Sequence, residues 1–171
     1  YLEDVVGIDT SHHIGPVLAE GYPDRMARNE RTAIDVMFEA ERYGQKNGKG
    51  FYKYETDPKG KPKKVADPET YKLLKQVQKD GDKSFSDEEI IERLMLPMII
   101  EAARCLDDGI VGSPTEVDMG LIMGLGFPPF RGGALKYCDT LGMAHVIERC
   151  KQYAPLGKLY EPTESMQQMA A

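Results

Sequence analysis

The strongest constraint on the fold is a helical periodicity between Asp87 and Asp108. Apolar side chains recur there at helical spacing in two adjacent rows. The rows are Ile90, Leu94, Met98 and Ala102, and Ile91, Met95 and Ile99. An apolar arc of this width predicts a helix at the centre of a domain. Ser86 and Glu89 predict a capped start, and Gly109 predicts the end. Pro97 predicts a kink because it removes a backbone donor.

Other segments also carry helix signals. Ser113 and Pro114 suit the N-cap and first position of a second helix, which ends at Gly124 and Gly126. The tail after Pro162 is expected to fray. Alternation over 51–54 predicts a short strand or extended edge. Further helices are predicted over about 9–20, 30–43, 68–78 and 140–153. The predicted fold class is therefore all-α, with at most a short extended segment near 51–54.

A short block occurs twice in the chain. Asp4-Val-Val-Gly-Ile8 opens the sequence, and Asp139-Thr-Leu-Gly-Met143 repeats its pattern. A helix and a Gly/Pro-rich turn precede the second block, whereas three residues precede the first. We therefore expect tandem helical repeats with a truncated first copy. The expected domains are 1–58 and 86–171, joined by a linker over 59–85 that holds a short helix and begins with the polar segment 59–67.

Composition excludes several classes of protein. A net charge of −6 argues against nucleic-acid binding, and the lysines of 59–64 are interpreted as a solvated turn. No apolar run reaches the roughly 20 residues of a membrane span. The three cysteines, Cys105, Cys138 and Cys150, are odd in number and lack metal-binding spacing. They predict free thiols in a reducing, cytoplasmic compartment. Cys105 lies on the apolar side of the 87–108 helix and is predicted to be buried.

Few residues carry a recognisable chemistry. His12, His13 and His145 lack the spacing of a metal site, so neither a metal nor a catalytic residue is predicted. Gly44–Gly50 and Gly124–Gly126 lack the flanking strand of a phosphate or dinucleotide loop, and they are interpreted as turns. The rigid segment Gly124–Gly133 has two open interpretations. It either packs helices closely or lines an apolar groove for a ligand.

The ordered motifs resemble one known family. Asp4–Asp9 and Gly44–Tyr54 resemble the C-terminal helical domain of L-3-hydroxyacyl-CoA dehydrogenases. A second set resembles another copy of that domain: Leu96-Pro97, Asp118-Met119-Gly120, Gly124–Phe130 and Leu135–Gly142. Two successive copies are typical of multifunctional alpha subunits of fatty acid oxidation complexes. The resemblance covers 2–160 and implies a fold like the C-terminal domain of 6-phosphogluconate dehydrogenase.

The resemblance implies an enzyme larger than this chain. Such alpha subunits join an enoyl-CoA hydratase/isomerase domain to an NAD-dependent dehydrogenase, and they assemble with a thiolase beta subunit. In the dehydrogenase, a His–Glu pair on the nucleotide-binding domain removes the hydroxyl proton of 3-hydroxyacyl-CoA. The chain lacks that domain. The resemblance therefore implies that the chain has neither catalytic residues nor an NAD site of its own.

Two positions depart from the family pattern. The family carries Asn-Arg-Leu where this chain has Glu92-Arg93-Leu94, and some members carry tyrosine where it has Met123. The second copy is thus expected to be structural, with an apolar substrate contact at Met123, Gly124 and Phe127. The expected function is to cover the acyl-CoA cleft and support subunit contacts, without activity alone. The alternative is a helical scaffold that binds a partner protein.

Overall fold

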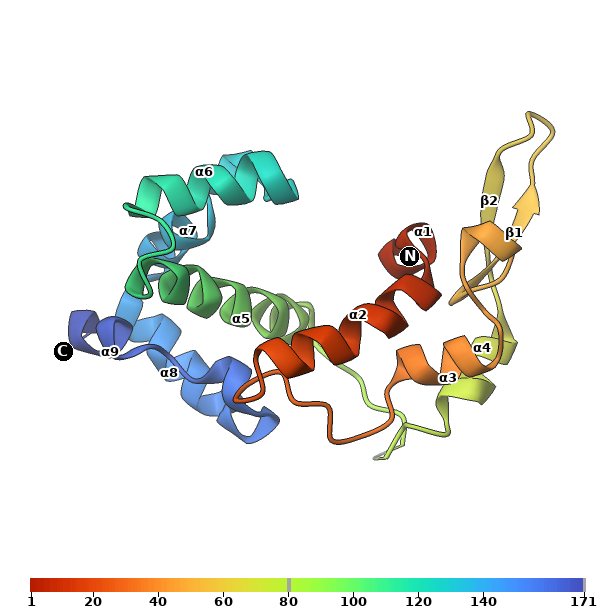
Figure 1. Cartoon of the computed structure of the whole chain (residues 1–171), viewed down its shortest axis with the longest axis horizontal. Helices are drawn as coiled ribbons and strands as arrows, with labels where there is room; N and C mark the ends of the chain where they lie inside the picture. Colours follow the sequence, from red (N-terminus) through yellow and green to blue (C-terminus); the bar gives the residue numbers. More distant parts are fainter. Residues whose placement is uncertain (80, 171) are drawn as a thin grey trace. The chain divides into compact units, whose positions relative to one another are not determined.

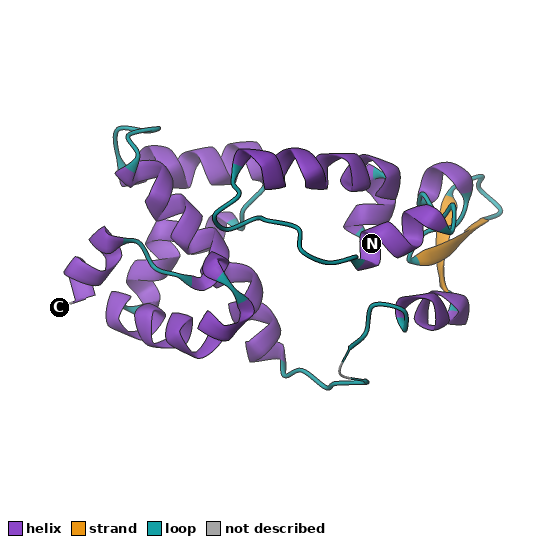
Figure 2. Ribbon diagram, turned by 60° about the horizontal axis from the view of Figure 1, so that its bottom comes forward, coloured by secondary structure: helices purple, strands orange, loops and turns teal. Residues whose placement is uncertain are grey.

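A computed structural model describes residues 1–79 and 81–170, and contacts between residues divide the chain into unit 1, residues 1–84, and unit 2, residues 85–171. Taken together, the described residues are mostly helical (Figures 1 and 2), which confirms the predicted fold class.

Unit 1 contains two successive helices, a third helix, an antiparallel hairpin and a short closing helix. The elements are α1 (Leu2–Val6), α2 (Ile8–Gly21), α3 (Ala33–Glu39), the 3₁₀ turn η1 (Gln45–Asn47), β1 (Tyr52–Thr56), β2 (Pro62–Ala66) and α4 (Pro68–Leu74). Helix α2 packs against α3, and α3 packs against α4. The hairpin register pairs Tyr52 with Ala66 and Thr56 with Pro62.

The structure corrects two expectations in unit 1. Residues 62–66, expected to belong to a polar linker, form β2 opposite β1. The helix expected over 30–43 spans only Ala33–Glu39. Its start is fixed by a capping box, in which Thr32 and Asp35 each accept a backbone hydrogen bond from the other. Glu41, with φ 52°, lies just beyond its end.

Unit 2 is built around the long helix α5. The elements are α5 (Asp87–Asp107), α6 (Pro114–Leu125), η2 (Pro129–Arg131), α7 (Ala134–Leu141), α8 (Met143–Tyr153), η3 (Ala154–Leu156), η4 (Lys158–Tyr160) and α9 (Glu164–Ala170). Helix α5 contacts α6, α7 and α8. Ser86 caps α5, Gly109 follows its end with φ 68°, and Pro97 lies inside a continuous helix.

The core of unit 2 corrects several sequence-based expectations. It is centred on Ile99, Ile100, Val146, Cys150 and Met166, each fully buried. The row Ile90, Leu94 and Met98 was expected inside, but all three side chains are exposed. Cys105 is also exposed rather than buried. The tail expected to fray forms α9, which buries Met166.

The expected helix over 140–153 is divided into two helices. Gly142 separates α7 from α8, with φ 89° and ψ 128°, a conformation that a residue with a Cβ adopts at a cost. In unit 1, Gly7 separates α1 from α2 in the same way, with φ 110° and ψ 120°. The repeated sequence block therefore encodes the same helix–glycine–helix turn in both units.

Candidate functional site

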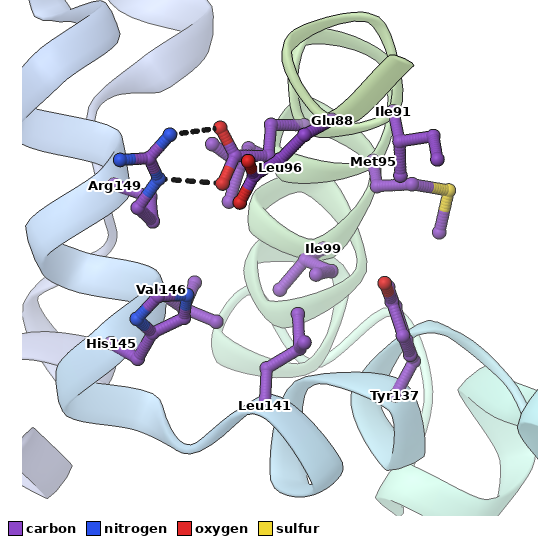
Figure 3. Close-up of a pocket in the computed structure, with 11 residues that line it drawn as sticks. Glu88, Ile91, Met95, Leu96, Ile99, Tyr137, Leu141, His145, Val146 and Arg149 are labelled. Atoms are coloured by element: carbon purple, nitrogen blue, oxygen red, sulfur yellow. Dashed lines mark hydrogen bonds and ion pairs between the residues drawn. The ribbon is translucent and has the colours of Figure 1, made fainter. Parts of the chain in front are cut away.

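The main candidate site in unit 2 is a pocket between α5 and α8. Its volume is about 330 Å³, and its wall is mostly apolar. Figure 3 shows side chains from α5 facing residues of α7 and α8 across this space. The apolar wall is formed by Ile91, Met95, Leu96, Ile99, Leu141 and Val146, with Tyr137 beside them. Glu88, Glu92, His145 and Arg149 add charged or polar groups to the lining.

Glu92 is held at this pocket by two side chains of α8. Arg149 donates from Nε to Glu92 Oε1 at 2.5 Å and from its terminal nitrogen to Oε2. Tyr153 donates its hydroxyl to Oε2 at 2.6 Å. Such a two-point arginine–carboxylate contact is strong and fixes orientation. Both carboxylate oxygens are therefore committed to the internal packing of unit 2.

The electrostatics of this cluster agree with a structural role. Hydrogen bonds from Arg149 outweigh burial and hold the pKa of Glu92 below its ordinary value. Burial and the hydrogen bond to Glu92 raise the pKa of Tyr153. Glu92 is consequently ionised at neutral pH and cannot donate a proton. The expectation that the second copy is structural, drawn from the asparagine-to-glutamate departure, stays a prediction.

The three expected substrate contacts lie at or beyond the end of α6 but differ in exposure. Met123 is 78% exposed and Gly124 is also exposed, whereas Phe127 is 5% exposed and packs in the core. Phe127 donates its N–H to the carbonyl of Leu121 at 3.1 Å. Met119, Leu125 and Phe130 add further exposed apolar surface on or near α6.

A buried carboxylate fixes the turn after α6. Asp118 accepts hydrogen bonds from the N–H groups of Leu135 and Lys136 at 2.8 and 3.0 Å. These donors lie in the first turn of α7, where helix N–H groups lack partners within the helix. A Cβ at Gly133 would meet the Asp118 side chain at 2.2 Å. Gly133 therefore permits the carboxylate to approach, and the Gly124–Gly133 segment has a packing role.

In unit 1 the carboxylate of Asp4, the first residue of the repeated block, is buried, and the sequence predicted no role for it. Asp4 accepts hydrogen bonds from Phe51 N, Tyr52 N and the Tyr54 hydroxyl, at 2.8, 3.0 and 2.7 Å. A Cβ at Gly50 would lie 2.3 Å from Asp4 Oδ1. The carboxylate thus fills the space and uses the N–H groups that a nucleotide pyrophosphate would need. The Gly44–Gly50 segment does not fit the phosphates of NAD, and it is a structural turn.

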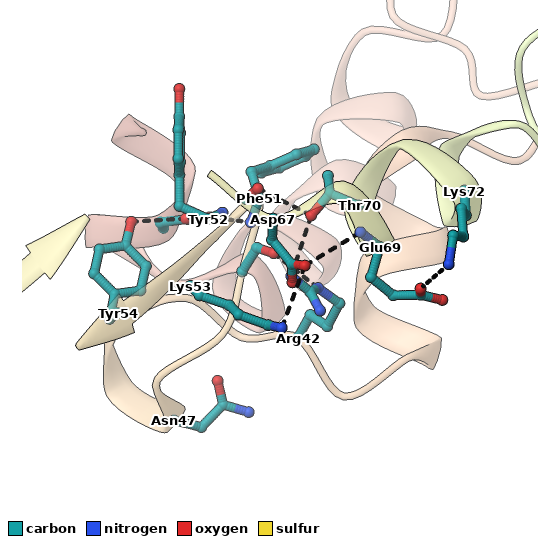
Figure 4. A network of polar contacts seen from close by, with 12 residues as sticks. Arg42, Asn47, Phe51, Tyr52, Lys53, Tyr54, Asp67, Glu69, Thr70 and Lys72 are labelled. Carbon is teal, nitrogen blue, oxygen red and sulfur yellow. Dashed lines mark hydrogen bonds and ion pairs between the residues drawn. The ribbon is translucent and has the colours of Figure 1, made fainter. Parts of the chain in front are cut away.

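Arg42 joins three segments of unit 1 beside this turn (Figure 4). Its Nε donates to the Gly50 carbonyl at 2.8 Å, and its terminal nitrogen donates to Asp67 Oδ2 at 2.6 Å and Thr70 Oγ1 at 3.1 Å. Burial opposes ionisation of Asp67, but hydrogen bonds from Arg42 and from the N–H of Glu69 hold its pKa below the ordinary value. This network has no counterpart in the sequence-based predictions, because its members lie far apart in the chain.

His12, which was predicted to have no metal or catalytic role, belongs to a polar cluster. Its Nδ1 lies 2.9 Å from Asp35 Oδ1, and its ring stacks on Phe38 at 4.0 Å between centroids. Arg28 also binds Asp35, at 2.5 and 2.6 Å. The cluster connects α2 to α3. No group of three His, Cys, Asp or Glu placed to hold a metal ion occurs in the described parts of the chain.

Among the helices of residues 1–79 and 81–170, none combines the length and apolar character needed to cross a membrane. The three cysteines are unpaired, and burial raises the pKa of Cys138 and of Cys150 to about 11. Both buried thiols are therefore protonated at neutral pH.

Comparisons with known proteins find relatives of this chain. A family model for the C-terminal domain of 3-hydroxyacyl-CoA dehydrogenase matches residues 1–54. The fatty acid oxidation complex subunit alpha of Pseudomonas paraeruginosa (strain DSM 24068 / PA7) is 56% identical over 170 residues, and that of Pseudomonas aeruginosa (strain LESB58) is equally similar. Each match covers 99% of this chain, which spans about a quarter (24%) of the length of these relatives.

A solved structure supports the fold. The dehydrogenase part of multifunctional enzyme 1 from C. elegans matches with a TM-score of 0.65 over 98% of this chain and 37% of that one, at 21% sequence identity. The chain is thus similar over residues 1–54 to the C-terminal domain of 3-hydroxyacyl-CoA dehydrogenase, and over nearly its whole length to part of fatty acid oxidation complex alpha subunits.

Proposed function

We propose that the chain is the helical, non-catalytic part of an NAD-dependent L-3-hydroxyacyl-CoA dehydrogenase within a fatty acid oxidation alpha subunit. Its role there is to cover the acyl-CoA cleft and to support subunit contacts. The observation that carries the proposal is the 56% identity over 170 residues to alpha subunits about four times longer. In this proposal, NAD binding and proton removal belong to other parts of the enzyme, which is cytoplasmic and assembles with a thiolase beta subunit.

The surface near the end of α6 supports a contact with acyl-CoA. Met123 and Gly124 are exposed beside other apolar groups, so an acyl chain can pack there without moving the core. Phe127 would act from beneath, because its buried ring fixes the turn that follows Gly126. Met123 offers the substrate apolar area and no hydrogen-bond donor.

Two experiments test the proposal. The purified chain, mixed with a 3-hydroxyacyl-CoA and NAD, is expected to form no NADH, while adding the remainder of the alpha subunit restores turnover. NADH formation by the chain alone would contradict the proposal. In calorimetry with an acyl-CoA, we expect a saturable binding event that depends on the acyl chain and that Met123→Asp abolishes. Met169→Asp is the matched control, because Met169 is a 65% exposed methionine on α9.

A helical scaffold that binds a partner protein is the second candidate function. Its support is the exposed row on α5, where Ile90 is 45%, Ile91 51% and Leu94 67% exposed. Contiguous exposed apolar groups of this kind mark interaction surfaces. The scaffold function predicts that Met123→Asp does not change acyl-CoA binding, so the calorimetry separates the two candidates. It also predicts that Leu94→Asp weakens assembly of the complex without altering acyl-CoA affinity.

A further inference from the structure

A pocket in unit 1 has a lining rich in aromatic rings. It lies where the hairpin meets α4 and has a volume of about 250 Å³. Tyr1, Phe51, Tyr52, Tyr71 and Leu74 form most of its wall. Figure 4 shows Phe51 and Tyr52 close to Asp67 and Thr70, the two buried polar residues of the lining. All of its lining residues belong to unit 1.

The polar groups of this lining are already satisfied. Asp67 binds Arg42 and the N–H of Glu69, and Lys53 lies 3.4 Å from its Oδ1. The hydroxyl of Thr70 donates to the Phe51 carbonyl at 3.0 Å. No buried side-chain nitrogen or oxygen lacks a partner in the described residues. The pocket therefore presents ring faces and other apolar surface to a ligand. It has no unpaired buried group that could hydrogen-bond to the edge of a base.

Positive charge lies directly beside the rings. The Lys64 ammonium is 4.8 Å from the centroid of the Tyr1 ring and 4.7 Å from that of Tyr52. These two cation–π contacts hold it at the pocket, and Lys64 forms no ion pair with any residue described in the structure. The segment 46–64 carries seven lysines against Glu55 and Asp57, in a chain of net charge −6. An anion at the pocket mouth would thus find a positioned and unpaired ammonium.

Aromatic faces next to an ammonium match a planar heterocycle that carries phosphate. We propose that this pocket binds the base of a purine nucleotide, with a phosphate on Lys64. The volume suits one base rather than a complete drug-sized ligand. With no free group to read base edges, selection depends on stacking, which favours the larger purine ring over a pyrimidine. Binding of a free nucleotide is independent of the proposed dehydrogenase role, whereas binding of the coenzyme A end rests on it.

The ligand can come from two sources with the same chemistry. One is a free adenosine phosphate, and the other is the adenosine 3′,5′-bisphosphate end of coenzyme A. Single-stranded nucleic acid shares the stacking chemistry, but it needs a charged groove that follows several phosphates. A pocket for one base in an acidic chain favours the mononucleotide.

The test is calorimetric titration of the full chain at low salt. We expect saturable binding of AMP, weaker binding of UMP and none of inorganic phosphate. If adenosine 3′,5′-bisphosphate and CoA bind more tightly than AMP, the ligand is the adenosine end of coenzyme A. If all three bind with equal affinity, the ligand is a free nucleotide. Absence of saturable AMP binding overturns the inference. The inference is also overturned if the affinity for oligo(dA) rises with its length while AMP shows no saturable binding.

Two variants locate the binding. Tyr71 is 71% exposed, so Tyr71→Ala keeps the fold and is expected to weaken AMP about tenfold through lost stacking. Lys64→Glu is expected to weaken AMP by at least about tenfold, because it reverses the charge that meets the phosphate. Lys59→Glu is the matched control at the exposed hairpin tip and should leave AMP affinity nearly unchanged. AMP binding that survives both Tyr71→Ala and Lys64→Glu overturns the inference.

Discussion

The two units differ in what fills their interiors. Among the described residues, unit 1 buries Asp4, Asp35, Arg42, Asp67 and Thr70 beside Ile8, Val36 and Met37. Unit 2 instead buries a continuous apolar cluster, with Asp118 and Thr163 as its buried polar residues. A paired buried charge is costly to disrupt, whereas an apolar core responds mainly to lost volume. We therefore expect unit 1 to be destabilised mainly by loss of charge pairing and unit 2 mainly by loss of core volume.

The same local device nevertheless recurs in both units. Gly7 N donates to the Glu3 carbonyl at 2.8 Å, and Gly142 N donates to that of Cys138 at 2.9 Å, so each glycine closes the helix before it. The aspartates of the repeated block differ. Asp4 is buried, whereas Asp139 is exposed and Asp118 of α6 supplies the buried carboxylate of unit 2. The repeat thus specifies a turn. Whether its aspartate is buried depends on the surrounding structure.

Acid should produce the largest difference between the units. The pKa values of Asp35 and Asp67 are held below the ordinary value, against burial, by Arg28 and Arg42 respectively. Carboxylates with lowered pKa stabilise the fold above the unfolded value, near 4, and lose this contribution as the pH falls through the folded value. Unit 1 should therefore unfold first between about pH 4 and pH 2.

Hydrogen exchange, corrected for intrinsic rates, measures this difference. Amides of α3 should lose protection at higher pH than amides of α5 and α8. Unit 2 also has a carboxylate with lowered pKa, Glu92, but its core is apolar. Simultaneous loss of protection in both units would show that polar burial does not set the acid response.

Truncation in the apolar core should affect unit 2 selectively. Ile99 is fully buried, so Ile99→Ala removes packed volume and should cost about 4 kcal/mol of unfolding free energy. Ile91→Ala is the control on the same helix, because Ile91 is 51% exposed and should cost less than about 1 kcal/mol. Urea denaturation followed by hydrogen exchange should show weakened α5 and unchanged α3. Equal costs for the two variants would contradict an Ile99-centred core.

Removing a buried cation should affect unit 1 selectively. Arg42→Met keeps the chain length but leaves Asp67 without its main partner. The expected cost is about 3 kcal/mol, at the low end for a broken buried pair, because the Lys53 ammonium remains 3.4 Å from Asp67 Oδ1. The control is Lys72→Met, which removes an exposed pair with Glu69 and should cost below about 0.5 kcal/mol. Full stability of Arg42→Met would show that Lys53 alone compensates the carboxylate.

Local signals in the sequence predicted much of the fold. Ser86 and Gly109 act on their own backbone, so the start and end of α5 follow from nearby residues. The division of the 140–153 helix at Gly142 was not predicted. The hairpin did not follow, because the polar residues of β2 form a strand only through pairing with β1. Burial of α9 depends likewise on the distant core that receives Met166.

The candidate site shows the same limit. Glu92 was identified from the family pattern, but its partners Arg149 and Tyr153 lie 57 and 61 residues away. The periodicity of a single helix does not predict a contact between residues so far apart in the chain. The exposure of Cys105 and Leu94 was missed for a related reason: an apolar row on a helix does not say which part of it meets another element.

The smallest effects should come from the two turn glycines, and they compare the units most directly. Gly7→Ala and Gly142→Ala each place a Cβ at positive φ, which costs about 1–3 kcal/mol. At Gly142 the added Cβ would meet no atom within 4 Å apart from its chain neighbours, so backbone strain is the whole cost. At Gly7 the new Cβ would meet Lys46 Nζ at 2.6 Å and Asp9 Oδ1 at 2.9 Å, so this exposed ion pair must also move. Its loss adds less than about 1 kcal/mol.

Gly21→Ala is the matched control, because Gly21 ends α2 without a positive φ and has open space around it. Denaturation midpoints should then rank Gly21→Ala as most stable, Gly142→Ala next and Gly7→Ala last. A Gly142→Ala variant as stable as the control would mean that the α7–α8 turn can relax. The turn would then be a rigid element in unit 1 alone, where Lys46 and Asp9 crowd it.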